Sequence, residues 1–106
     1  MGSVYQDLAQ YNKAKEYHDK ALIISKKIFG EEHGDVATSY DNLGNVYQAL
    51  AQYNKAKEYH DKALIIRKKI FGEEHGDVAT CYNNLGTVYQ ALARYNEAKE
   101  IGRAHV

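Results

Sequence analysis

The 106-residue sequence contains no proline, no tryptophan and a single cysteine. Without proline, no position obliges a helix to kink or stop. The lone cysteine, Cys81, excludes an internal disulfide. Fourteen basic residues balance fourteen acidic ones, so the chain lacks the positive charge that dominates binding to nucleic acid or to an anionic membrane. We therefore expect neither nucleic acid nor membrane as a partner.

Long apolar runs are absent as well. The longest strongly apolar run, residues 63–66, is far shorter than the ~20 residues that span a bilayer. No signal-peptide pattern opens the chain. These features predict a cytoplasmic protein.

What the sequence has instead is an internal repeat. Residues 11–52 recur as residues 53–94 with five changes, which gives a period of 42 residues. A period of this length indicates a solenoid, in which each unit buries its apolar face against its neighbours. The five pairs that differ are Ser25/Arg67, Ser39/Cys81, Asp41/Asn83, Asn45/Thr87 and Gln52/Arg94.

Apolar residues at spacings of three and four predict helices over residues 11–29, 35–51, 53–71 and 77–93, with a further helix beginning at residue 95. Gly30 suits a left-handed C-terminal position, and Asp35 is the predicted N-cap of the following helix. Gly44 is the smallest residue at the predicted crossing of two helices. A bulky side chain there should separate them.

The repeat divides the chain into one array over residues 1–100. The array comprises a truncated first unit (1–29), a full hairpin (35–71) and a partial hairpin (77–100). Residues 101–106 depart abruptly from the repeat. Because this hexapeptide resembles the translation of a sequencing adapter, we expect it to be a non-native tail, and the array to be part of a longer one.

The repeated positions resemble the tetratricopeptide repeat (TPR) motif over all but the last six residues. The matching residues of the second unit are Tyr40, Leu43, Gly44, Tyr47, Ala56 and Ala63, and those of the third are Tyr82, Leu85, Gly86, Tyr89 and Ala98. Two positions differ from the usual motif: His60 stands at an aromatic position, and Lys68 replaces a proline. The longer period and the loop sequence 75–79 are similar to the kinesin-light-chain type. The resemblance implies an all-α, right-handed superhelix of antiparallel helix hairpins, whose concave face binds extended peptides.

On that geometry the first helix of each hairpin presents four short polar side chains to the concave face. These candidate peptide-binding residues are Thr38, Asp41, Asn45, Gln48, Thr80, Asn83, Thr87 and Gln90. Such side chains can pair with the amides of an extended peptide. A clamp for a C-terminal carboxylate is not expected, because the family's clamp needs lysine and arginine on this face. A second hypothesis is a structural spacer, or a self-association module whose apolar ends stack on those of another chain, in either case without a specific peptide ligand.

The sequence predicts no catalytic, cofactor or metal site. Two pairs of histidines, His18/His60 and His33/His75, are separated by one repeat, and none has a cysteine or second histidine at ligand spacing. No general base is placed beside Cys81, and no glycine-rich phosphate loop is present. The predicted partner is therefore a protein or peptide, bound without catalysis.

Overall fold

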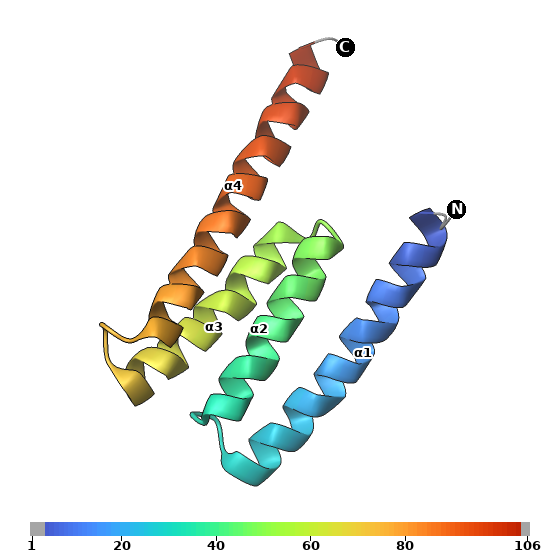
Figure 1. Cartoon of the computed structure of the whole chain (residues 1–106). Coiled ribbons are helices and arrows are strands. Elements are labelled where there is room, and N and C mark those ends of the chain that lie inside the picture. Colours follow the sequence, from blue (N-terminus) through green and yellow to red (C-terminus); the bar gives the residue numbers. More distant parts are fainter. Residues whose placement is uncertain (1–3, 105–106) are drawn as a thin grey trace.

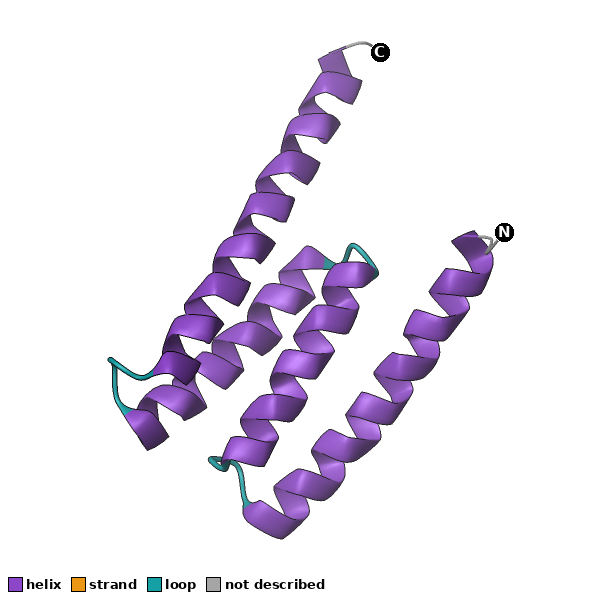
Figure 2. Ribbon diagram, viewed as in Figure 1, coloured by secondary structure: helices purple, strands orange, loops and turns teal. Residues whose placement is uncertain are grey.

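The computed structural model describes residues 4–104, and every regular element in that range is a helix (Figures 1 and 2). The helices are α1 (Val4–Phe29), α2 (Gly34–Ala49), α3 (Tyr53–Phe71) and α4 (Gly76–Ala104). Each packs antiparallel on the next along the chain. The radius of gyration is 15.8 Å, against about 13 Å for a compact domain of this length. The helices therefore form an open stack.

The loops after α1 and α3 are built alike. Gly30 and Gly72 both have φ of +86°, a region that favours glycine, and the prediction for Gly30 is confirmed. The predicted N-cap at Asp35 is wrong, because His33 is the cap. Its Nδ1 accepts a hydrogen bond from the backbone N–H of Asp35 at 3.0 Å. Asp35 instead lies in the first turn, where its charge complements the helix dipole.

The structure differs from the sequence-based prediction at two breaks. Residues 8–24 and 50–66 have the same sequence, yet only the second copy contains a turn. That turn reverses the chain between α2 and α3 with Ala51 at φ +60°. The expected breaks before Tyr11 and Tyr95 are absent, because α1 and α4 continue through them. The predicted partial hairpin over residues 77–100 is thus a single helix.

Tertiary packing explains where the chain turns. A left-handed alanine costs about 1–2 kcal/mol, so the turn at Ala51 needs contacts that hold the hairpin closed. Among them, the ring of Tyr59 stacks on Tyr47 with centroids 5.3 Å apart. The positions that match Tyr59 and its successor in α4 hold Ile101 and Gly102, which supply no ring. When α4 continues as a helix instead, its backbone N–H and C=O groups are hydrogen-bonded without these contacts.

The core is centred on α2, which is covered on its two sides by α1 and α3. Its buried apolar cluster contains Leu22, Val36, Ala37, Tyr40, Leu43, Tyr47, Ala56, Ala63, Ile66, Cys81 and Val88. At the crossing of α2 and α3, a β-carbon added to Gly44 would lie 2.6 Å from Nε2 of His60. The predicted close approach at Gly44 is confirmed, and His60 fills the space that it leaves.

Candidate functional site

The predicted binding residues lie on α2 and α4, which run in the same direction with α3 packed against both. On α2, Thr38 and Asn45 are exposed and Gln48 is half-buried. On α4, all four predicted residues are exposed: Thr80, Asn83, Thr87 and Gln90. We call these seven side chains the polar face. Thr38, Thr80 and Thr87 also donate to a backbone carbonyl four residues earlier, which fixes their hydroxyl groups on the helix.

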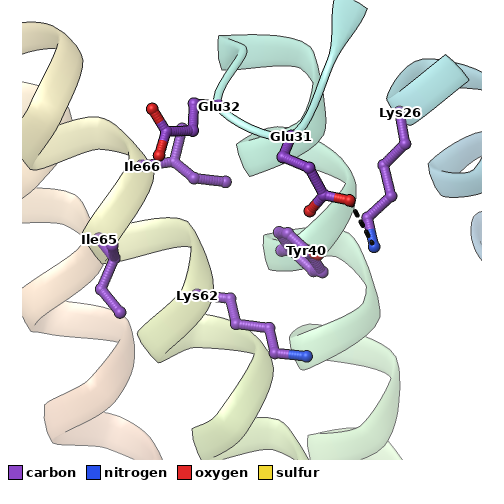
Figure 3. Close-up of a pocket in the computed structure, with 7 residues that line it drawn as sticks. All are labelled: Lys26, Glu31, Glu32, Tyr40, Lys62, Ile65 and Ile66. Carbon is purple, nitrogen blue, oxygen red and sulfur yellow. Dashed lines mark ion pairs between the residues drawn. The ribbon is translucent and has the colours of Figure 1, made fainter.

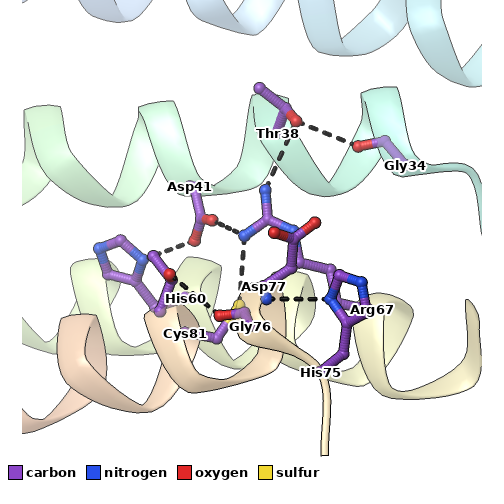
Figure 4. A network of polar contacts seen from close by, with 10 residues as sticks. Gly34, Thr38, Asp41, His60, Arg67, His75, Gly76, Asp77 and Cys81 are labelled. Atoms are coloured by element: carbon purple, nitrogen blue, oxygen red, sulfur yellow. Dashed lines mark hydrogen bonds and ion pairs between the residues drawn. The ribbon is translucent and has the colours of Figure 1, made fainter. Parts of the chain in front are cut away.

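Asp41 is the exception, since it is only 8% exposed. Its Oδ1 lies 2.8 Å from Nδ1 of His60, and its Oδ2 accepts from the guanidinium of Arg67 (Figure 4). Because a carboxylate can only accept, Nδ1 of His60 carries the proton. Both oxygens of Asp41 are thus engaged within the chain. The prediction of Asp41 as a groove residue is corrected, because the side chain stabilises the helix stack instead.

Arg67 connects three helices through one side chain. Besides Asp41 of α2, its Nη1 lies 3.2 Å from Sγ of Cys81 in α4, and its Nη2 lies 3.5 Å from Oγ1 of Thr38. Burial tends to lower the pKa of the Arg67 guanidinium, but the contacts with Cys81 and Asp41 outweigh it and raise the pKa. The guanidinium is therefore held as a cation directly beneath the polar face.

This network joins three of the five positions at which the repeat copies differ, namely 41, 67 and 81. The residues that match these three in the opposite repeat copy are all uncharged: Asn83 matches Asp41, Ser25 matches Arg67 and Ser39 matches Cys81. Sequence reasoning missed the network, because its members are 14 and 26 residues apart. One signal in the sequence could have indicated the network. Among the five positions that differ between the two repeat copies, one pair exchanges serine for the cation Arg67 and another exchanges asparagine for the carboxylate Asp41.

Cys81 has no catalytic features. Its side chain is fully buried, and burial raises the pKa of its thiol even though Arg67 acts in the opposite sense. A reactive cysteine needs a lowered pKa and access to solvent. Among the described side chains, those of residues 7–102, no three of the metal-binding types gather into a ligand set. Along residues 4–104, no helix combines the length and the apolar character that crossing a membrane requires.

Two pockets lie away from the polar face. The larger, about 330 Å³, is a shallow hollow between α1, α2, α3 and the loop after α1 (Figure 3), and it is lined by Lys26, Glu31, Glu32, Tyr40, Lys62, Ile65 and Ile66. Within it, the ammonium groups of Lys26 and Lys62 each lie 5.5 Å from the ring centroid of Tyr40. The second, about 300 Å³, lies between the α2–α3 turn and α4. Neither pocket is lined by a residue of the polar face, which is an open surface.

The helix hairpins and their motif residues agree with a sequence family. Two overlapping segments, residues 1–64 and 35–105, match the tetratricopeptide repeat. The chain belongs to the tetratricopeptide repeat family. TPR repeats generally mediate interactions between proteins, and the TPR fold is a scaffold. The predicted all-α solenoid of antiparallel hairpins is confirmed.

A solved TPR structure is similar over most of the chain. The crystal structure of BtubC (BKLC) from P. vanneervenii has 35% sequence identity and a TM-score of 0.73, and the match covers 78% of this chain and 33% of that one. Because that protein is of the kinesin-light-chain-like type, the predicted TPR type is confirmed. The chain thus spans about a third of the length of this relative. Among curated proteins, no significant match to this chain was found.

Proposed function

We propose that this TPR segment is a cytoplasmic interaction scaffold that binds an extended peptide along its polar face, as part of a longer array and without catalysis. The observation that carries the proposal is the pair of exposed polar stripes on α2 and α4. An extended peptide has unpaired backbone amides along its whole length. Short amide and hydroxyl side chains on two helices of the same direction offer matching donors and acceptors.

The Arg67 network supports this surface from below. It ties α2 to α4 through Asp41 and Cys81, so the two stripes are held at a fixed separation. A preformed surface loses little entropy when it binds. The proposal therefore assigns peptide contacts to the seven residues of the polar face, and a positioning role to Asp41.

Panning a random-peptide display library against the full chain tests the proposal. The Asn45→Arg/Gln48→Arg variant places two long cations on the α2 stripe and should abolish enrichment. The matched control, Gln10→Arg/Asn12→Arg, makes the same chemical changes at exposed positions of α1 and should enrich the same peptides as the wild type. Both variants should keep the wild-type helical circular dichroism spectrum.

One motif that is lost only with the α2 variant would support a peptide site on this face. Absence of enrichment, or enrichment that survives Asn45→Arg/Gln48→Arg, would contradict it.

A further inference from the structure

The charged residues of the chain are distributed unevenly among its helices. α1 and α3 contain lysine, aspartate and glutamate along most of their length, whereas residues 34–49 of α2 and 76–93 of α4 contain no lysine, arginine or glutamate. The acidic residues in these two ranges are Asp35, Asp41 and Asp77. Asp35 and Asp77 lie in first turns, where the positive end of the helix dipole offsets their charge. The polar face therefore lies on the least charged helix segments of the chain.

The lysines that α3 extends toward its neighbours are directed away from the polar face. Lys55 and Lys62 lie over the rings of Tyr47 and Tyr40, at 5.3 and 5.5 Å from the ring centroids. These two rings are roughly 130° around α2 from the centre of its polar stripe. On α4, two further lysines lie over the matching rings. The first cation beyond the α4 stripe is Arg94, which ends the uncharged stretch.

Asp41 is the carboxylate within the α2 stripe itself, about one turn from both Thr38 and Asn45. Its charge is cancelled by Arg67, which reaches from α3 to Oδ2 of Asp41 (Figure 4). The second guanidinium nitrogen, Nη2, lies 3.5 Å from Oγ1 of Thr38, so the cation meets the edge of the polar face. At the matching position of α4 stands Asn83, which has no charge to cancel. Both stripes are thus neutral, but only the α2 stripe needs a partner for this.

His60 is the second titratable group beside Asp41, and a doubly protonated imidazole would also cancel its charge. Nδ1 of His60 already lies 2.8 Å from Oδ1 of Asp41, so the additional proton would have to bind at Nε2. That atom is buried and has no hydrogen-bond partner among the described residues. An N–H group buried without an acceptor is unfavourable. The neutrality of the α2 stripe therefore depends on Arg67.

A ligand at the polar face thus meets amide and hydroxyl groups and no free counter-charge. A charged side chain that leaves water for such a surface loses hydration that no opposite charge repays. We propose that the peptide bound by the polar face is uncharged where it contacts the two stripes, and that Arg67 sets this preference by neutralising Asp41. This inference rests on the proposed function. Backbone amides and the side chains of asparagine, glutamine, serine and threonine are the ligand groups that fit.

The peptides enriched on the full wild-type chain provide the first test. In the motif that is lost with Asn45→Arg/Gln48→Arg, uncharged polar residues should predominate, and charged residues should be rarer than in the unselected library. Titration calorimetry of one synthetic enriched peptide then measures its salt dependence. The Kd should change less than about twofold between about 50 and 500 mM sodium chloride, because salt screens charge pairs and not uncharged hydrogen bonds.

Arg67→Gln tests the role of the cation. Glutamine keeps a long side chain with an N–H donor for Asp41 but removes the positive charge, so the α2 stripe becomes negative. The enriched peptides should then gain lysine or arginine at one position several-fold, because a complementary charge favours binding. Asp41→Asn/Arg67→Gln makes the stripe neutral again and should enrich the wild-type motif.

Lys69→Gln is the matched control. It removes one cation from the same helix and leaves the carboxylate of Glu32 unpaired, but that exposed pair joins α3 to the loop after α1. Its enriched peptides should therefore match those of the wild type. Circular dichroism of every variant precedes the panning. If Arg67→Gln loses the helical spectrum, the composition and the salt dependence of the wild-type peptides decide.

The outcomes separate this inference from the proposed function. A motif with a fixed charged residue, lost with Asn45→Arg/Gln48→Arg, would leave the peptide site in place and overturn the uncharged ligand. A Kd that rises several-fold with salt would do the same, as would a folded Arg67→Gln variant that enriches the wild-type motif unchanged. Absence of any motif would contradict the proposed function, and this inference with it.

Discussion

Asp41 and Arg67, which are 26 residues apart in the sequence, form a largely buried ion pair between α2 and α3. Both stand at positions where the two repeat copies differ. A solenoid of near-identical units has little to distinguish one neighbour from another, because each interface repeats the last. Here a charged pair marks one interface, and the uncharged counterparts Ser25 and Asn83 belong to the units on either side. Such pairs can specify which helix packs on which.

The first prediction concerns this pair. Asp41→Asn leaves the guanidinium of Arg67 without its counter-charge, and Arg67→Ser leaves the carboxylate beside His60 without its cation. Each single change should lower the free energy of unfolding by about 1–3 kcal/mol. The double variant restores a neutral pair and should lose less than the sum, with a coupling energy of about 1–3 kcal/mol. Urea denaturation of the wild type, the two single variants and the double variant measures this coupling energy as a double-mutant cycle.

An exposed ion pair in the same chain is the control. Lys69 and Glu32 lie 2.6 Å apart with side chains that are mostly solvent-accessible, so the coupling of Glu32→Gln with Lys69→Gln should not exceed about 1 kcal/mol. Equal coupling energies for the two pairs would contradict a special role for the buried pair.

The second prediction compares two glycines at matching positions. Gly44→Ala places a methyl group 2.6 Å from Nε2 of His60, and that ring is fully buried and hydrogen-bonded to Asp41. The ring cannot swing away, so the variant should lose about 1–3 kcal/mol of stability. Gly86→Ala meets no atom within 4 Å and should gain about 0.5–1 kcal/mol, since alanine favours a helix interior. Thermal melts of dilute samples measure both, and effects of the same sign would contradict the role of His60.

The helices themselves could be predicted from the sequence. The bounds of α3, residues 53–71, agree with the prediction, because apolar spacing and the glycine that follows its C-terminus are local signals. The continuity of α1 through Tyr11 and of α4 through Tyr95 could not be predicted, since the same local sequence turns at Ala51 and stays helical elsewhere. Packing against a partner helix decides whether this sequence forms a turn or a continuous helix.

The candidate site was predictable in part. The spacing of the repeat places seven polar side chains on exposed or half-buried positions of α2 and α4. The burial of Asp41 was not foreseen, because it depends on His60 and Arg67, which lie 19 and 26 residues further along the chain. A motif describes which positions face outward, but a single long side chain from a neighbouring helix can cover one of them.

The third prediction concerns the turn between α2 and α3. Ala51 has φ of +60°, where a β-carbon is unfavourable by about 1–2 kcal/mol. Ala51→Gly should raise stability by roughly 0.5–1 kcal/mol, because relief of strain exceeds the added flexibility of the unfolded chain. Ala93→Gly makes the same change at the matching position of α4, which is helical, and should lower stability by about 0.5–1 kcal/mol. Urea midpoints with opposite shifts are expected, and a loss of stability in Ala51→Gly would contradict a strained turn.

The last prediction is a loss of stability at alkaline pH that originates in the stacked rings of Tyr47 and Tyr59. Burial raises the pKa of both phenols above the ordinary value of 10.0. A phenol that ionises more readily when unfolded stabilises the native state fully below pH 10, and that contribution is lost as the pH rises through the folded pKa. The urea midpoint should therefore fall as the pH is raised past 10. Tyr59→Phe removes one of the two phenols and should make the fall less steep, whereas Tyr89→Phe, which alters a half-exposed ring, should keep the wild-type slope. Equal slopes for all three proteins would mean that ionisation of the buried pair does not limit alkaline stability.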